Sequence, residues 1–159
     1  MIRYTLWLIF FFIFSAFADS LDKGLEYFKS GNYEKAQQVF QQLIDENDQN
    51  HAAYFWLGRT YFMLKDFEQA SDYFEEAIDL NENNADYYFW YGNSLGNEIQ
   101  TVNVFKQAIM AGDILEAYEN AIKADPGHIG AHVGAAQFYL QAPGIMGGTS
   151  IRQKKKQVY

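Results

Sequence analysis

The chain has 159 residues, of which 18% are aromatic and two are proline, and its formal net charge is −8. This length suits a single domain, and the acidic balance disfavours nucleic-acid binding, because proteins hold phosphate backbones with Lys and Arg. The absence of cysteine excludes disulfides, thiolate catalysis, cysteine-ligated metals and a lipid-modified N-terminal cysteine.

Residues 1–18 carry the pattern of a secretory signal peptide. Arg3 precedes an apolar run, and small residues then alternate up to Ala18, after which we expect cleavage. The run is about 14 residues long, whereas a helix needs roughly 20 to cross a bilayer. The alternative is an uncleaved membrane anchor. We therefore expect an exported protein, periplasmic or secreted if its source is bacterial, that meets the membrane only through this segment.

From Asp19 onward the sequence repeats itself with a step of 34 residues. Residue types recur at this step in five sets, which are Gly24, Gly58 and Gly92; Tyr27 and Tyr61; Ala36 and Ala70; Phe40 and Phe74; and Trp56 and Trp90. In the first unit, apolar residues at three- and four-residue spacing predict helices at 20–29 and 32–45. Gly31 predicts a left-handed turn between these helices, and Asn32 predicts the cap of the second one.

The second unit carries the pattern of a known family. Its residues Tyr54, Leu57, Gly58 and Tyr61, followed by Ala70 and Phe74, resemble the W-x-x-L-G-x-x-Y and A-x-x-x-F pattern of the tetratricopeptide repeat family. The resemblance implies one all-α solenoid of about three and a half helix-turn-helix repeats, at 19–50, 51–84, 85–128 and 129–159. Within it we expect Gly58 to face its partner helix beside Ala70, because a larger side chain would prevent close approach.

The third and fourth units are irregular. The family pattern returns in the third unit only after an insertion of ten residues, at Ile114, Tyr118, Ala121 and Pro126. The inserted residues keep helical spacing, which favours a lengthened second helix, with Gly112 as the place for a bend, over a loop insertion. A first helix follows at 129–141, where we expect the small and aromatic contacts from Ala135, Ala136, Phe138 and Tyr139. A short basic helix from Thr149 or Ser150 then serves as an end cap, unless the chain is a shortened form of a longer array.

No set of side chains indicates catalysis. His128 and His132 are four residues apart, a spacing that can serve a metal, but a third ligand is not evident, so we expect neither metal nor cofactor. The Gly147–Ser150 run lacks the Lys of a nucleotide-binding loop and indicates a connector. The carboxylates lack the desolvated pairing that acid–base catalysis needs. Favourable interaction with a helix dipole explains the basic residues 152–156, and contact with anionic lipid or a second copy is the alternative.

The resemblance directs attention to one surface, because the first helix of each repeat lines a concave groove in this family. It points to a partner-binding set of Phe55, Arg59, Phe62, Met63, Phe89, Asn93 and Asn97. The apolar members would surround Arg59 as a charged anchor, a composition typical of interface hot spots. Burial of the aromatic side chains by a neighbouring repeat is the alternative. We expect a non-enzymatic protein-interaction scaffold of the cell envelope whose groove binds a segment of a protein partner, or else a self-associating structural module that forms homo-oligomers.

Overall fold

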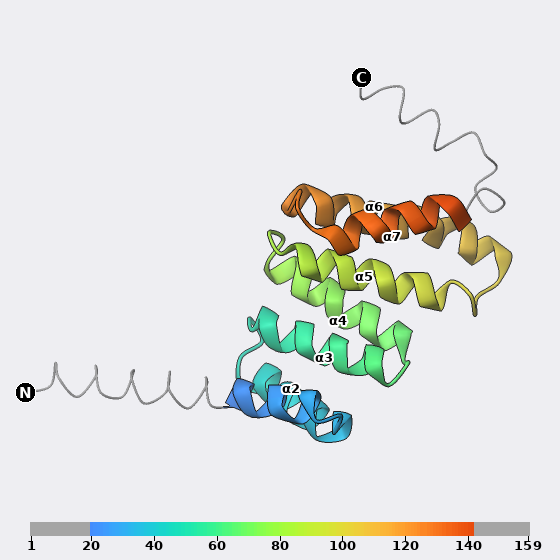
Figure 1. The fold of residues 1–159 in the computed structure, drawn as a ribbon. Coiled ribbons are helices and arrows are strands. Elements are labelled where there is room, and N and C mark those ends of the chain that lie inside the picture. Colours follow the sequence, from blue (N-terminus) through green and yellow to red (C-terminus); the bar gives the residue numbers. More distant parts are fainter. Residues whose placement is uncertain (1–19, 142–159) are drawn as a thin grey trace, which may run out of the picture.

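The computed structural model describes residues 20–141, which form antiparallel helix pairs stacked one upon the next (Figure 1). A helix over residues 20–29 is followed by α2 (Tyr33–Glu46), α3 (His51–Met63), α4 (Phe67–Leu80), α5 (Ala85–Glu98), α6 (Val104–Ala124) and α7 (Ile129–Gln141). No strand occurs in this range, and the predicted all-α repeat fold is confirmed. None of its helices is long and apolar enough to cross a bilayer. The predicted signal peptide, the Gly147–Ser150 connector and the basic tail lie outside the described residues.

An Asn or Asp side chain caps the start of each helix from α2 to α6. The capping side-chain oxygens accept backbone N–H groups in the first turns, and the capping residues are Asn32, Asn50, Asp66, Asn84 and Asn103. Such a cap satisfies one of the N–H groups that a helix start leaves without a partner. The helix starts are therefore set locally, and the predicted cap at Asn32 is confirmed.

The turns inside the first two repeats share one backbone conformation. Gly31 has a φ of +76°, as predicted, and Lys65, which stands 34 residues later, has a φ of +66°. A left-handed φ costs an L-residue with a side chain about 1–2 kcal/mol, and glycine has no such cost. The second repeat therefore keeps the turn geometry of the first in spite of its less suitable residue.

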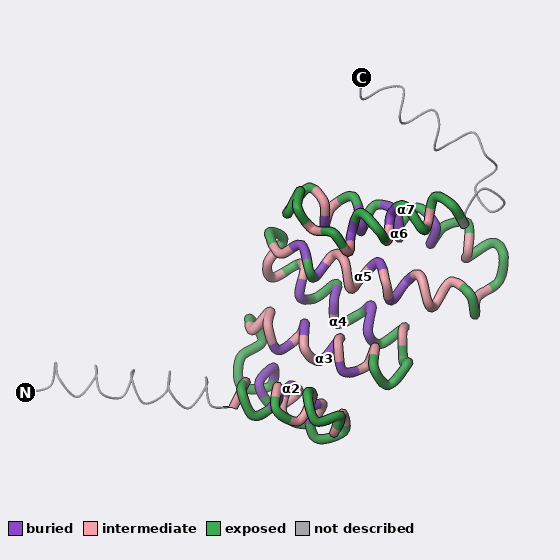
Figure 2. Tube along the Cα trace, in the orientation of Figure 1, coloured by how far each residue is buried: buried purple, intermediate pink, exposed green. Residues whose placement is uncertain are grey.

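Each helix pair closes around a glycine that contacts an aromatic ring. A Cβ added to Gly58 would lie 2.9 Å from Cε1 of Phe74 and 3.2 Å from the carbonyl oxygen of Ala70, which confirms the predicted close approach. Gly24 meets Phe40 in the same way. Phe40, Phe74 and Ala70 are fully buried, and Figure 2 shows such buried segments recurring along the helices of the stack. A larger residue at Gly58 would overpack this contact, at a cost of about 1–3 kcal/mol.

The insertion of the third repeat lengthens a helix, as predicted. Helix α6 has 21 residues where α4 has 14, and it continues as helix through Gly112. Its added first turns leave Val104, Phe105 and Ile109 exposed to solvent, while Lys106 pairs with Glu98 of α5 at 2.9 Å. The insertion thus extends the helix beyond the part that packs into the core.

Helix α7 packs through only some of the residues that the sequence pattern indicated. Ala135 is buried and Phe138 packs against the core, as predicted, whereas Tyr139 is 36% exposed. Gly134 faces Tyr118 of α6, where an added Cβ would lie 2.6 Å from the ring, and Ala131 and Ala135 are buried. Ala136 is exposed, so the prediction that it belongs to the packing face is wrong. Because of the ten-residue insertion, counting 34 residues from Gly92 no longer locates the equivalent position in α7. Helix α7 contains several small residues, and spacing alone does not show which of them face α6.

Candidate functional site

The predicted binding set lies on the first helices of the repeats, α3 and α5, which contact each other directly and lie on one side of the stack (Figure 1). Phe55, Arg59, Phe62 and Met63 are on α3, and the other three residues are on α5. The two parts of the set therefore lie on neighbouring first helices. The structure nevertheless divides the set into buried, partly buried and exposed side chains.

Phe55 does not belong to the exposed surface. Only 8% of it is accessible, and its ring centroid lies 4.8 Å from that of Tyr87 and 5.8 Å from that of Phe74. It therefore fills the space between the second and third repeats. The prediction that Phe55 is part of the exposed apolar patch is therefore wrong. The alternative, burial by the neighbouring repeat, is correct for this residue.

Arg59 is surrounded by aromatic rings from three repeats. Its guanidinium carbon lies 3.7 Å from the ring centroid of Trp90, 5.4 Å from that of Trp56 and 5.6 Å from that of Phe28. These four residues, Phe28, Trp56, Arg59 and Trp90, are called the Arg59 cluster below. A cation over aromatic faces gains roughly 0.5–2 kcal/mol from the ring quadrupoles. The cluster therefore stabilises a charge that burial alone would disfavour.

The charge of Arg59 has no direct counter-ion within residues 20–141. The ion pair of this range is Lys106 with Glu98, while Asp86 accepts a hydrogen bond from His128. The Nε of Arg59 is buried without a hydrogen-bond partner. Burial lowers the pKa of Arg59 below its ordinary value, and the negative charge of Asp86 opposes that shift. The cation is thus held mainly by rings, with one carboxylate acting from beyond contact distance.

Phe62 and Met63 continue this surface toward the end of α3. The ring centroid of Phe62 lies 5.1 Å from that of Trp90 and 5.3 Å from that of Phe67, with edge-to-face geometry at both contacts. Met63 is 43% exposed. Together with Trp56 and Trp90 they form an apolar strip beside Arg59, and Met63 is its most accessible member.

The residues predicted on α5 are mostly engaged within the fold. The Phe89 ring centroid lies 4.9 Å from that of His128, and Phe89 also meets the backbone of Gly130 at the start of α7. The Tyr118 hydroxyl donates to Oδ1 of Asn93 at 2.9 Å, and the Asn97 amide donates to the Asn93 carbonyl at 2.8 Å. All three predicted residues are half-buried, and the contacts above hold them within the fold. They therefore add little to the accessible surface beside α3.

The histidines considered for metal binding contact other groups of the fold instead, and His128 reaches Asp86 of α5. The backbone N–H of Ala131 donates to Nδ1 of His128 at 2.9 Å, which leaves Nε2 to donate to Oδ1 of Asp86 at 3.1 Å. Nε2 of His132 lies 2.9 Å from the Pro126 carbonyl oxygen. Both rings therefore stabilise the turn before α7. No group of three metal-ligating side chains occurs within the described part of the chain.

The two tryptophans of the Arg59 cluster were noted in the sequence only as markers of the 34-residue step. Trp56 and Trp90 occupy the same place in successive repeats, and each faces Arg59. A large aromatic residue repeated beside an arginine on a first helix is a signal that could have identified the cluster. The periodicity alone could not tell a packing position from a surface position.

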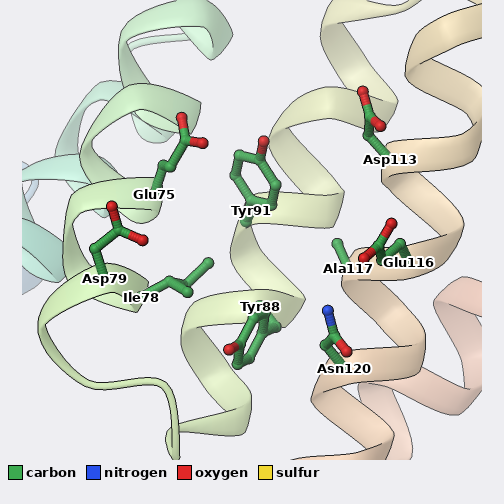
Figure 3. A pocket seen from close by; sticks show the side chains of 9 residues that line it. All are labelled: Glu75, Ile78, Asp79, Tyr88, Tyr91, Asp113, Glu116, Ala117 and Asn120. Atoms are coloured by element: carbon green, nitrogen blue, oxygen red, sulfur yellow. The ribbon is translucent and has the colours of Figure 1, made fainter.

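A pocket of about 240 Å³ lies between α4, α5 and α6 (Figure 3). Four carboxylates border it together with the rings of two tyrosines, and these six residues are Glu75, Asp79, Asp113, Glu116, Tyr88 and Tyr91. Burial, followed by the nearby acidic groups, raises the pKa of Tyr91 to about 12. Burial, followed by the charge of Glu116, raises the pKa of Asp113. The pocket is therefore electronegative and would repel an anion.

Comparison with known proteins agrees with this geometry. Residues 21–85 match a family model described as tetratricopeptide repeat, while no curated protein matches the chain. Among solved structures, the first tetratricopeptide repeat domain of Spaghetti (RPAP3), bound to the HSP90 peptide SRMEEVD, is similar with a TM-score of 0.69 and 20% identity. That similarity covers 78% of this chain and 90% of that one.

Two bacterial structures are also similar. A thermophilic tetratricopeptide repeat protein of Thermus thermophilus has a TM-score of 0.70 and 18% identity over 78% of this chain and 64% of that one. The Yersinia enterocolitica type III secretion chaperone SycD, in complex with a peptide of the translocator YopD, has a TM-score of 0.66 and 13% identity over 80% of this chain and 95% of that one. At these identities the similarity establishes the fold alone. Residues 21–85 thus match the tetratricopeptide repeat family, and the helical hairpin fold of that region continues through α7.

Proposed function

We propose that the face formed by the first helices binds a segment of a protein partner, and that the chain acts as an interaction module without catalysis. The observation that carries this proposal is the apolar strip of Trp56, Phe62, Met63 and Trp90 beside Arg59, which has the aromatic, Met and Arg composition typical of protein interfaces. Structurally similar repeat domains bound to an HSP90 peptide and to a YopD peptide support it by analogy.

We further propose that the partner belongs to the cell envelope. The support is the sequence pattern of residues 1–18, which is typical of a secretory signal peptide cleaved after Ala18. The test is N-terminal sequencing of the protein from fractionated cells of its native host. A mature chain that begins at Asp19 outside the cytoplasm is the expected result. A chain that retains residues 1–18 within the cytoplasm would contradict the proposed location.

The binding face can be tested by site-specific photocrosslinking in the native host. A benzophenone amino acid replaces Met63 in one variant of the full chain and Glu76, which is exposed on α4, in a matched control variant. We expect crosslinks to a defined partner from position 63 and none to that partner from position 76. Equal yields at both positions, or a partner captured only from position 76, would refute the proposed face. Crosslinks from position 63 to a second copy of the chain would favour the self-associating alternative.

A further inference from the structure

The first two turns of α6 carry an apolar surface that the rest of residues 20–141 leaves uncovered. Val104 is 77% exposed, Phe105 is 81% exposed and Ile109 is 57% exposed. Phe105 and Ile109 are four residues apart, so they lie on the same face of the helix. Adjacent exposed apolar side chains on a helix are typical of contact surfaces, because water solvates them poorly. The lengthening of α6 has therefore created a surface that a further segment can cover.

The end of α7 lies near this surface. Figure 1 shows the start of α6 and the end of α7 at the same end of the stack. Phe138 packs against the cluster that contains Met110, and Met110 directly follows Ile109 in α6. Gln141, the last residue of α7, is three residues beyond Phe138. Four further residues of extended chain span up to about 14 Å, so residues 145–146 can reach the first turns of α6.

Residues 142–159, which lie outside the described range, have an apolar part followed by a basic part. Ile145 and Met146 are apolar. Gly147–Gly148 come next, and two glycines allow the chain to reverse its direction, because glycine adopts backbone conformations that other residues disfavour. Residues 152–156 then carry one Arg and three Lys, and the whole segment contains no Asp or Glu.

The exposed side of α6 has the complementary order. Its apolar turns are followed, on the same side of the helix, by the exposed residues Glu116 and Glu119. Neither carboxylate takes part in an ion pair within residues 20–141. Glu116 is seven residues after Ile109, which corresponds to about 10 Å along the helix. The basic part begins six residues after Met146, and six residues span about 9 Å as a helix and about 20 Å when extended, so the two charged parts can meet.

We propose that residues 142–156 fold back onto the exposed side of α6. Ile145 and Met146 contact its first two turns, and the basic residues lie beside its exposed carboxylates. The covalent connection through Gln141 favours this occupant over a separate molecule, because a tethered segment has an effective concentration on the order of millimolar. A chain end can detach while the stack stays folded, so the contact adds little to the free energy of global unfolding. The inference concerns the insertion and does not depend on the proposed binding face.

A spin label on the full chain tests this contact. The chain contains no cysteine, so Ser150→Cys places a single nitroxide label between the apolar part and the basic part of the segment. The readout is the paramagnetic relaxation enhancement of backbone amide signals in ¹⁵N-labelled protein. We expect the amides of residues 104–116 to lose most of their intensity and those of α2 to keep theirs. Unchanged intensities over residues 104–116 would overturn the inference.

Two variants separate a specific contact from the mere proximity of a tethered segment. Ile109→Gln removes an apolar contact from α6, and we expect a severalfold smaller relaxation enhancement over residues 104–116 with an unchanged circular dichroism spectrum. Ile129→Gln is the matched control, because Ile129 is 78% exposed at the opposite end of α7 and should leave the enhancement unchanged. An undiminished enhancement in Ile109→Gln would overturn the inference.

A mixed sample identifies the occupant. It combines ¹⁵N-labelled chain that carries no nitroxide with unlabelled chain that carries one, so that only contacts between molecules cause relaxation. We expect no enhancement over residues 104–116 in this sample. An enhancement as large as that within a single chain would show that a second copy covers α6, and it would overturn the inference.

Discussion

Replacing Phe55 by alanine should destabilise the stack without removing an exposed binding contact. The Phe55 side chain is 8% accessible and lies between the second and third repeats. Its ring centroid is 5.4 Å from that of Trp56, 5.8 Å from that of Phe74 and 4.8 Å from that of Tyr87. The substitution therefore removes a ring that three other rings contact, and it opens a cavity at the interface between two repeats.

The expected loss follows from burial and from the ring contacts. Truncation of a buried Phe to Ala typically costs about 3–5 kcal/mol, and each aromatic pair contributes about 0.5–1.5 kcal/mol beyond its area. We expect about 3–4 kcal/mol for Phe55→Ala, because helices on either side of a repeat interface can partly close the cavity. Domains of this size are stable by about 5–15 kcal/mol in total. The loss should also weaken coupling between repeats, since each repeat is stabilised by its neighbours.

Urea unfolding of the full chain, followed by circular dichroism and tryptophan fluorescence, measures this effect. Phe105→Ala is the matched control, because Phe105 is 81% exposed on α6 and the same atoms are removed. We expect the control to change the free energy of unfolding by less than about 0.5 kcal/mol. A Phe55→Ala variant within about 1 kcal/mol of the wild type would refute its assignment to the core, since that is well below the cost of emptying a buried aromatic site.

Two further substitutions test the turn geometry and the acidic pocket. Lys65→Gly should raise the free energy of unfolding by about 0.5–1 kcal/mol in urea, because glycine adopts the φ of +66° without steric cost; an unchanged or lower value would show that this turn is not strained. Burial, and then the charge of Glu116, raises the pKa of Asp113. The folded state therefore binds the proton of the Asp113 carboxyl group more tightly than the unfolded state does. As a result, wild-type stability falls as pH rises above the ordinary pKa of 3.8. Asp113→Asn should therefore be more stable than the wild type at pH 7 and lose that advantage near pH 3, as measured by urea unfolding at both pH values; an equal difference at the two would contradict this linkage.

The sequence alone was sufficient for the repeat architecture, because that architecture depends on local and periodic signals. The 34-residue step identified the repeated pairs, Gly31 and Asn32 located the first turn and cap, and helical spacing showed that the insertion lengthens α6. It also placed Gly58 against its partner helix. Apart from the step itself, which compares successive repeats, these features depend on residues within one repeat, where backbone conformation and spacing leave few alternatives.

Only the tertiary structure decided what each residue of the predicted surface does. A residue on one face of a helix can be exposed to solvent or buried by the next repeat. Which of these occurs depends on how much of that face the following helix pair covers. Phe55 is therefore in the core while Met63 is exposed on the same helix, and Phe89 packs against His128 and against Gly130 at the start of α7. The rings of Trp56 and Trp90, from successive repeats, come together over Arg59 only when the repeats stack. The sequence determined the helices and their repeat, and stacking determined which aromatic side chains form the core and which surround the unpaired cation.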